Sequence, residues 1–323
     1  MSPMRRILVV LLKLAISLAL IWFAFSKIDT GSAFGLLQSI HPGVVSGALA
    51  LLVLQQFAAG GRLHRLMRLV RAPISLVRAV DAVFVGAFFM QTFISFIGGD
   101  AMRVWRMATA GVPIASAFKA VLLDRAVGFV ALVALIVAGL PLLFRIMTEP
   151  AMRAGVVLAV ILGMLGTLAL LLMHRLPEAL RRWRIFRIVS DISSLAMSIS
   201  SRGADISFLL GVSLLIQVLA VIAMYVIAFG LGVEARFVDF LVLVPPVMLL
   251  AMLPISIAGW GVREGAMAVA LNLVGIAAEQ SVAISVCFGL CMMVLGLPGG
   301  LIWFIVRKGG AGVDILTDAR EKR

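Results

Sequence analysis

Two arginines close two short glycine-rich segments that lie about half a chain apart. Residues 94–103 read Ile-Ser-Phe-Ile-Gly-Gly-Asp-Ala-Met-Arg, and residues 255–263 read Ile-Ser-Ile-Ala-Gly-Trp-Gly-Val-Arg. Each segment interrupts an apolar stretch and ends in a charge, at Arg103 and at Arg263. A planar guanidinium can bind phosphate oxygens through two parallel hydrogen bonds. If the two interruptions meet, we expect these arginines to clamp one phosphate group.

Acidic residues stand near both arginines and are expected to hold them when no anion is bound. Helices that restart at glycine-rich interruptions would also offer N–H groups and positive dipole ends to an anion. The candidate substrate-binding residues are Gly98, Gly99, Asp100, Arg103, Asp124, Arg125, Gly259, Gly261, Arg263 and Glu264. The alternative is structural: ion pairs or interfacial anchors for the charges, and tight turns or close helix packing for the glycines.

The composition predicts what must position these residues. Of the 323 residues, 63% are hydrophobic and 13% are charged, and the mean hydropathy is +1.17. Several apolar runs reach the ~20 residues that span a bilayer. We therefore predict an all-α polytopic membrane protein with a single integral membrane domain, residues 1–323. The net charge of +13 indicates cytoplasmic loops and contact with anionic lipid rather than nucleic acid.

Arginine clusters give the predicted topology. The basic segments 62–78, 175–202 and 307–323 and the N-terminus are expected in the cytoplasm. Six full spans are expected at residues 7–26, 44–60, 117–143, 154–173, 206–231 and 281–306. Residues 79–106 and 238–259 are expected to be re-entrant hairpins, since full crossings there would place basic segments outside. Pro245, Pro246 and Pro254 are expected to break the second of them. Eight full spans remain the alternative.

The two hairpins would enter from opposite faces, which predicts an inverted repeat with halves at about residues 44–143 and 207–306. Paired interruptions in such halves point to a binding site near the bilayer midplane. Residues 174–205 between the halves are expected to form a cytoplasmic, interfacial amphipathic segment. Its apolar positions are Leu180, Trp183, Phe186, Val189, Ile192 and Ile199, with arginines between them.

Three motifs carry a resemblance to a known family. They are Gly98-Gly99-Asp100 with Arg103, then Asp124-Arg125, and Gly259-x-Gly261-x-Arg263-Glu264. They resemble the flippase-like membrane family typified by the transmembrane region of bacterial lysylphosphatidylglycerol synthase, the multiple peptide resistance factor. The resemblance implies an inner-membrane protein that moves a lipid or lipid-linked headgroup between leaflets. Because 17 residues follow Val306, it implies a stand-alone member without the synthase domain.

One departure from the family pattern concerns the second half. Gly289 stands where an arginine equivalent to Arg125 is expected.

We expect translocation rather than catalysis. The sequence contains no Walker motif, so transport would be facilitated or coupled to an ion gradient. His41, His64 and His174 lie in separate segments, and Cys287 and Cys291 fit buried apolar positions, so no metal site, cofactor or enzyme is expected. The expected ligand is an anionic phospholipid or a polyprenyl-linked lipid. The alternatives are an intramembrane lipid-modifying enzyme and a non-transporting partner of a lipid or glycan biosynthesis complex. A homo-oligomer or a biosynthetic enzyme partner stays open.

Overall fold

The computed structural model describes residue 35 and residues 40–92, 96–175, 184–252 and 259–308. All regular structure in these ranges is helical. The long helices are α3 (Pro42–Leu69), α6 (Ile114–Ile146), α7 (Pro150–Leu172), α10 (Gly203–Gly230) and α13 (Ala278–Lys308). The shorter helices are α4 (Leu76–Thr92), α5 (Phe96–Ala108), η1 (Met173–Arg175), α9 (Arg184–Ser200), α11 (Phe237–Ala251) and α12 (Val262–Asn272). The predicted all-α class is confirmed.

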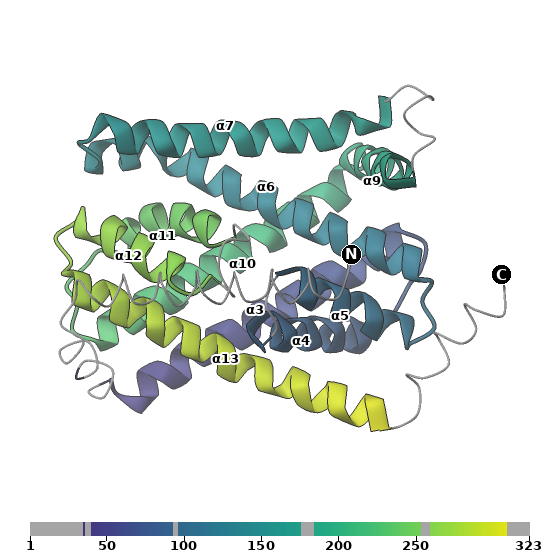
Figure 1. Ribbon diagram of the computed structural model, residues 1–323, viewed down its shortest axis with the longest axis horizontal. Helices are drawn as coiled ribbons and strands as arrows, with labels where there is room; N and C mark the ends of the chain where they lie inside the picture. The colour runs from purple at the N-terminus through teal and green to yellow at the C-terminus, as the bar shows by residue number, and fades with distance from the viewer. Residues whose placement is uncertain (1–34, 36–39, 93–95, 176–183, 253–258, 309–323) are drawn as a thin grey trace, which may run out of the picture.

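The long helices run along the molecule and enclose two helical hairpins (Figure 1). Hairpin α4–α5 lies toward one end of the long helices, and hairpin α11–α12 lies toward the other. Five described helices are long and apolar enough to cross a membrane, namely α3, α6, α7, α10 and α13. They coincide with five of the six expected spans, and the sixth, residues 7–26, lies outside the described residues. The described helices are those of a polytopic membrane protein.

The described helices form two series of four with the same order and nearly the same lengths. Helices α3 and α10 each have 28 residues, and α6 and α13 have 33 and 31. The hairpin helices have 17 and 13 residues in the first series and 15 and 11 in the second. Each hairpin also packs on the long helix of the other series, α4 on α13 and α11 on α6. Two related halves are therefore interlocked.

Corresponding helices end in the same way. After α5, Gly111 has a φ of +87°, and Val112 N donates to Met107 O. After α12, Gly275 has a φ of +83°, and the equivalent bond joins the amide of residue 276 to the carbonyl of residue 271. Arg71 after α3 and Gly232 after α10 also have positive φ values and the same bond pattern. This cap satisfies the last carbonyls of a helix and turns the chain sharply.

The second hairpin departs from its predicted form in two respects. Its second arm, α12, lies beyond the predicted range of residues 238–259. Helix α11 continues through Pro245 and Pro246 and ends only at Ala251. Both prolines lie in the middle of a helix that packs on α6, α10 and α12. Neighbouring helices in a bundle can accommodate the peptide groups that proline frees. The expectation that these prolines break the helix is wrong, and Pro254 lies outside the described residues.

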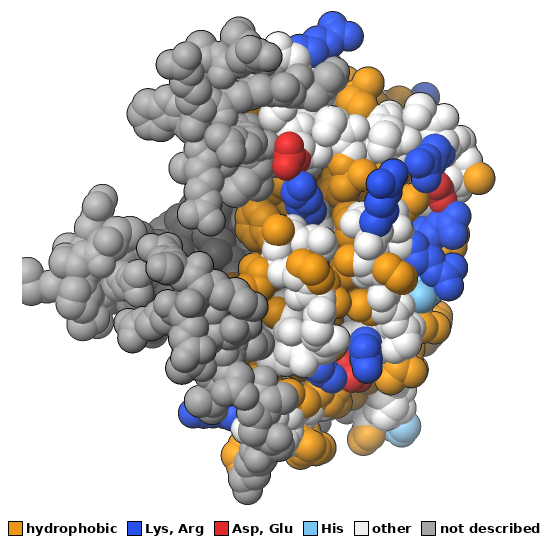
Figure 2. Space-filling view, turned by 90° about the vertical axis from the view of Figure 1, so that its right-hand side faces the viewer, with side chains coloured by type: hydrophobic (Ala, Val, Ile, Leu, Met, Phe, Trp, Pro, Cys, Tyr) orange, Lys and Arg blue, Asp and Glu red, His pale blue; other side chains and the backbone are white. Residues whose placement is uncertain are grey.

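Basic side chains gather at one end of the molecule. Figure 2 shows this end with Lys and Arg side chains spread across it. The exposed arginines of the loops and helix ends there are Arg68, Arg71, Arg78, Arg202 and Arg307. Loops 70–75 and 109–113 lie at this end, whereas loop 231–236 lies at the opposite one (Figure 1). The asymmetry matches what the positive-inside rule requires of a cytoplasmic surface.

The amphipathic segment packs on protein where its side chains are described. Ile192 and Ile199 of α9 are 0% and 4% exposed. They belong to an apolar cluster that also contains Leu66 of α3 and Leu209 of α10. This part of the predicted membrane-facing stripe therefore faces the helix bundle. Leu180 and Trp183 lie outside the described residues.

Candidate functional site

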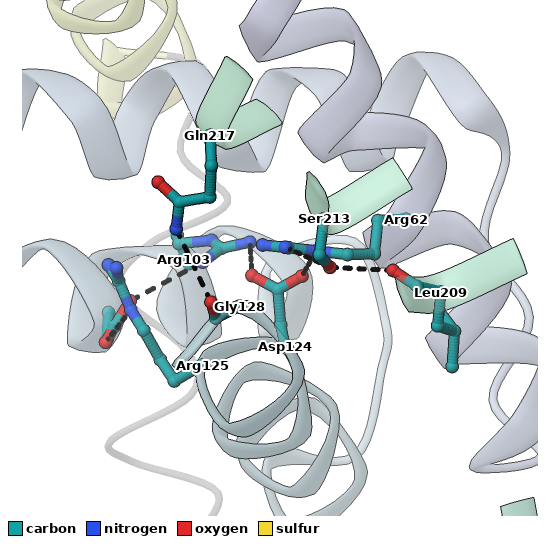
Figure 3. A network of polar contacts seen from close by, with 9 residues as sticks. Arg62, Arg103, Asp124, Arg125, Gly128, Leu209, Ser213 and Gln217 are labelled. Carbon is teal, nitrogen blue, oxygen red and sulfur yellow. Dashed lines mark hydrogen bonds and ion pairs between the residues drawn. The ribbon is translucent and has the colours of Figure 1, made fainter. Parts of the chain in front are cut away.

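A buried carboxylate on α6 joins two arginines from different helices. Asp124 Oδ1 accepts from Arg62 Nε at 2.7 Å, and Asp124 Oδ2 accepts from Arg103 Nη2 at 2.9 Å. Arg62 Nη1 also donates to Ser213 Oγ of α10 at 2.8 Å. Figure 3 shows the two guanidiniums on either side of the carboxylate. The three charged residues are at most 7% exposed, so helices α3, α5, α6 and α10 meet around a buried ion cluster.

A second ion pair adjoins this cluster and is more open. Arg125 Nε and Nη2 donate to Asp100 at 2.8 Å in a forked arrangement. Arg103 Nη1 lies 3.5 Å from Asp100 Oδ1, so Asp100 connects both pairs. The side chains of Arg125 and Asp100 are 35% and 23% exposed. We call the five residues Arg62, Asp100, Arg103, Asp124 and Arg125 the arginine network.

The arginine network carries excess positive charge. Within the described part of the chain, its three guanidiniums pair with two carboxylates. Among the described residues, Arg103 Nε and Gln55 Oε1 are both buried, and neither atom has a hydrogen-bond partner. Both residues line a cavity of about 170 Å³ together with Arg62, Asp124 and Arg125. A buried donor without a partner costs free energy, so this cavity is suited to an anion that also carries a hydrogen-bond donor.

The arginine network lies well inside the helices. Arg62 precedes the end of α3 by seven residues and Asp124 follows the start of α6 by ten. At 1.5 Å per residue these positions are about 10 and 15 Å from the helix ends. The charges thus lie about two to three helical turns from the helix ends.

The second glycine-rich interruption builds a different environment. Arg263 Nη2 donates to Glu264 Oε1 at 2.7 Å and Arg263 Nε donates to Ser285 Oγ at 2.9 Å. Glu264 Oε2 accepts from the amide of Gly261 at 2.6 Å. The Arg263 guanidinium lies 5.0 Å from the centre of the Trp260 ring. One buried cation here balances one buried anion, so this pair is neutral.

The two predicted arginines do not share partners. Arg103 pairs with Asp124 and Asp100, whereas Arg263 pairs with Glu264 and Ser285. The cavity at the arginine network is lined by Arg103 and not by Arg263. Gly99 is buried but Trp260 is only half-buried, and the arginines lie in separate clusters. Arg103 and Arg263 are therefore held by different acidic residues in this structure.

The remaining glycines show how closely the arginines are packed. A Cβ on Gly86 of α4 would lie 2.7 Å from Arg103 Cδ, and a Cβ on Gly99 would lie 2.7 Å from Gly86 O. Gly259 and Gly261 have φ values of +81° and +83°, where a side chain is strained. Gly98 is half-buried. These contacts and turns support the structural role considered for the glycines.

Gly289 lies against the arginine of the second hairpin. A Cβ on Gly289 would overlap the Arg263 guanidinium and lie 2.7 Å from Trp260. Gly128, which is 161 residues earlier, has its hypothetical Cβ 3.3 Å from Arg62 Nη1. Both glycines leave room for a guanidinium. Helices α6 and α13 begin at Ile114 and Ala278, 164 residues apart, and by this offset Gly289 stands at the position of Arg125, as the sequence predicted. Asp124 and Ser285 each accept from the arginine of the hairpin in the same half.

Other charges of the membrane segments form local pairs. Arg106 Nη2 donates to Asp81 at 3.0 Å within hairpin α4–α5. Arg236 Nη2 donates to Asp239 at 2.8 Å at the start of α11. The Lys119 ammonium donates to Asp191 of α9 at 2.9 Å. These pairs hold neighbouring residues and elements together, which is a structural role for Asp81 and Asp239.

Arg62 was missed as a site residue because it belongs to the arginine stripe that ends α3. Its neighbours Arg68 and Arg71 are exposed, but Arg62 is 7% exposed. The signal that could have identified Arg62 is the length of the helix that contains it. Pro42 at the start of α3 is only 20 residues before Arg62, so a continuous helix keeps Arg62 inside the bundle.

A comparison with known protein families shows to which family this helical arrangement belongs. Residues 10–300 match the family described as the lysylphosphatidylglycerol synthase TM region. The chain belongs to this family. The match covers the arginine network, both hairpins, four of the five long helices in full and α13 up to residue 300. A comparison with curated proteins gave no match. Membership in the lysylphosphatidylglycerol synthase TM region family agrees with a multi-pass membrane protein related to lipid modification or transport.

Proposed function

We propose that this protein translocates a lipid with an anionic headgroup between the leaflets of the bacterial inner membrane, with both termini in the cytoplasm. The observation that carries the proposal is the cavity at the arginine network, where an unpartnered guanidinium N–H lies inside a helical membrane bundle. Membership in a lipid-related membrane family supports it. Ionisable residues within membrane segments commonly mark substrate pathways.

The chemistry of the cavity fits a phosphate group. A phosphate oxygen would accept from Arg103 Nε and supply the negative charge that the arginine network lacks. Arg125 already holds a carboxylate through its fork, and the same fork fits two phosphate oxygens. Asp100 and the phosphate therefore compete for one cation. The buried acceptor Gln55 Oε1 would receive a hydroxyl or ammonium group of the same headgroup.

Exchange of partners provides a path for release. Asp124 stays between Arg62 and Arg103, while the more exposed Asp100 gives up Arg125 when the phosphate binds and takes it back when the phosphate leaves. This exchange keeps the buried cations partnered at each step, which matters because an unpaired charge in a low-dielectric interior is costly. It requires no covalent chemistry, so the proposed role is transport rather than catalysis.

Purified protein in liposomes tests the proposal. Fluorescent phospholipids with anionic and zwitterionic headgroups are placed in one leaflet, and their appearance in the other is followed by quenching. We expect movement of the anionic lipid, loss of that movement in Arg103→Gln, and retention in Arg236→Gln. The latter is the matched control, because the Arg236 side chain is 80% exposed and pairs only locally.

The outcomes separate the alternatives. Chemical change of the lipid in the same liposomes would indicate an enzyme. Neither movement nor change over a panel of anionic and polyprenyl-linked lipids would favour a partner of a biosynthetic complex. Equal movement in Arg103→Gln and wild type would contradict the assigned site. Size-exclusion profiles and thermal unfolding of Arg103→Gln and Arg103→Lys show whether a loss reflects folding.

A further inference from the structure

A second cavity lies beside the arginine network and has the opposite chemistry. It has a volume of about 160 Å³ and is lined by residues of α3, α6, α7, α9 and α10. We call it the apolar pocket. Its walls include Leu66, Leu123, Val127, Leu171, Ile199 and Leu209.

The apolar pocket offers little to a polar ligand. Its two hydroxyl-bearing lining residues are Thr167 and Ser200. Thr167 Oγ1 donates to Gly163 O, and Ser200 Oγ donates to Met197 O, both at 2.9 Å. Each hydroxyl is thus bonded within its own helix. Cavities lined by apolar groups stay dry and take up apolar molecules, because an empty void forfeits dispersion contacts.

Three helices connect the apolar pocket to the arginine network. On α6, Leu123 lines the pocket and the next residue, Asp124, lines the other cavity. On α3, Leu66 lies one turn from Arg62. On α10, the carbonyl of Leu209 accepts from Ser213 at 2.7 Å, and Ser213 in turn holds Arg62. Figure 3 shows Leu209 next to this bond. One helical turn is about 5.4 Å, so both cavities fit the two parts of one amphipathic molecule.

The surroundings of the apolar pocket are those of a lipid-facing surface. Its lining residues Val130, Thr167 and Leu210 are partly exposed, so the pocket reaches the outside of the bundle. The outer face of α7 is strongly apolar, with Leu158 and Leu162 exposed by 56% and 59%. A surface of this composition contacts hydrocarbon chains in a membrane. The bilayer therefore supplies the apolar molecule that is always present at this opening.

We propose that the apolar pocket binds an acyl chain of the lipid whose anionic headgroup enters the cavity at the arginine network. This inference rests on the proposed function for the identity of the headgroup. In this proposal the lipid tail lies against α6, α7 and α10, and binding of the acyl chain is part of substrate recognition. A lipid anchored at both ends is selected by its tail as well as by its charge.

Photo-cross-linking in liposomes tests the inference. The probe is an anionic phospholipid with a diazirine in one acyl chain, and cross-linked peptides are mapped by mass spectrometry. Ala126 lines the pocket on α6, so Ala126→Leu places an isobutyl group inside it. Ala134 is exposed on the same helix, so Ala134→Leu is the matched control. We expect cross-links on the pocket-lining peptides of α6 and α10, reduced severalfold in Ala126→Leu and unchanged in Ala134→Leu.

The controls separate this inference from the proposed function. Equal pocket cross-links in Ala126→Leu and Ala134→Leu, or none in wild type, would overturn the pocket even if the wild type moves lipid. Pocket cross-links in a wild-type protein that moves no lipid would keep the pocket and reject translocation. If Ala126→Leu unfolds, Ala196→Leu on α9 probes the same pocket from its other side.

Discussion

Asp124 is the carboxylate on which two buried guanidiniums depend. It bonds to Arg62 and Arg103 through separate oxygens and is 2% exposed. Asp124→Asn should leave excess positive charge inside the bundle. Because removing one partner of a buried ion pair costs about 3–5 kcal/mol, we expect a large fall in the thermal unfolding temperature of the purified protein.

Asp100→Asn is the comparison for this experiment. Asp100 is 23% exposed at the side chain and pairs with the 35% exposed Arg125, so water can replace the lost interaction. Its unfolding temperature should fall much less, and its affinity for anionic lipid should rise because the competing carboxylate is gone. Equal destabilisation by both variants would show that Asp124 has no special structural role.

Arg263 and Arg103 are predicted to respond differently to the same substitution. Lysine at position 263 cannot reach Glu264 and Ser285 together through a planar fork, so Arg263→Lys should lower thermal stability. Its effect on lipid movement should be smaller than that of Arg103→Lys. Loss of one charge-assisted hydrogen bond is worth about 1.5–3 kcal/mol, so Arg103→Lys should slow movement roughly tenfold or more.

Lipid movement and unfolding temperature are measured on the same liposome and detergent samples. If both lysine variants slow movement equally while staying folded, the two arginines act in one transport site after all. That result would restore the shared clamp expected from the sequence.

At the scale of elements, hairpin α4–α5 is held by a glycine-rich face of α13. A Cβ on Gly299 would overlap the carbonyl group of Phe84 and lie 2.8 Å from Val85 N. A Cβ on Gly296 would lie 3.1 Å from Phe88 Cα. Small residues of this kind let membrane helices approach closely. The contact joins a helix of the second half to the hairpin of the first.

Gly299→Ala should therefore force α13 away from α4. Overpacking commonly costs about 1–3 kcal/mol, and here the obstacle is backbone, which cannot rotate aside. We expect a lower unfolding temperature and, since α4 lines the cavity through Gly86 and Met90, slower lipid movement. Gly211→Ala on α10 is the control, because a Cβ there meets nothing within 4 Å. A Gly299→Ala protein as stable as Gly211→Ala would contradict this packing.

At the scale of the whole molecule, the two ends are predicted to face different compartments. Ser116 lies at the start of α6 at the basic end, and Glu234 lies in the loop before α11 at the other end. Cys287 and Cys291 are buried, so both can be replaced before single cysteines are introduced. We expect a membrane-impermeant maleimide to label Glu234→Cys in intact cells and Ser116→Cys only after permeabilisation. Labelling of Ser116→Cys from outside would favour eight full spans.

Several features could be predicted from short stretches of sequence, because neighbouring residues determine them. Apolar runs long enough to span hydrocarbon predicted α3, α6, α7, α10 and α13. Glycines that permit a positive φ predicted the interruptions at Gly259 and Gly261. The family resemblance came from short charged motifs that the family match bears out. Proline was the misleading local signal, since Pro245 and Pro246 lie within α11.

The sequence by itself determined the helical membrane class, the family and the interruption at Gly259 and Gly261, because each depends on neighbouring residues. The interruption expected at Gly98 and Gly99 is not seen there, since both residues lie within α5. Only the tertiary structure decided which charges meet. It brought Arg62 of α3 to Asp124 of α6 and placed Arg263 against Glu264 and Ser285. A guanidinium can pair with any carboxylate in reach, and reach is set by how helices pack. The spacing of residues along the chain does not contain that information.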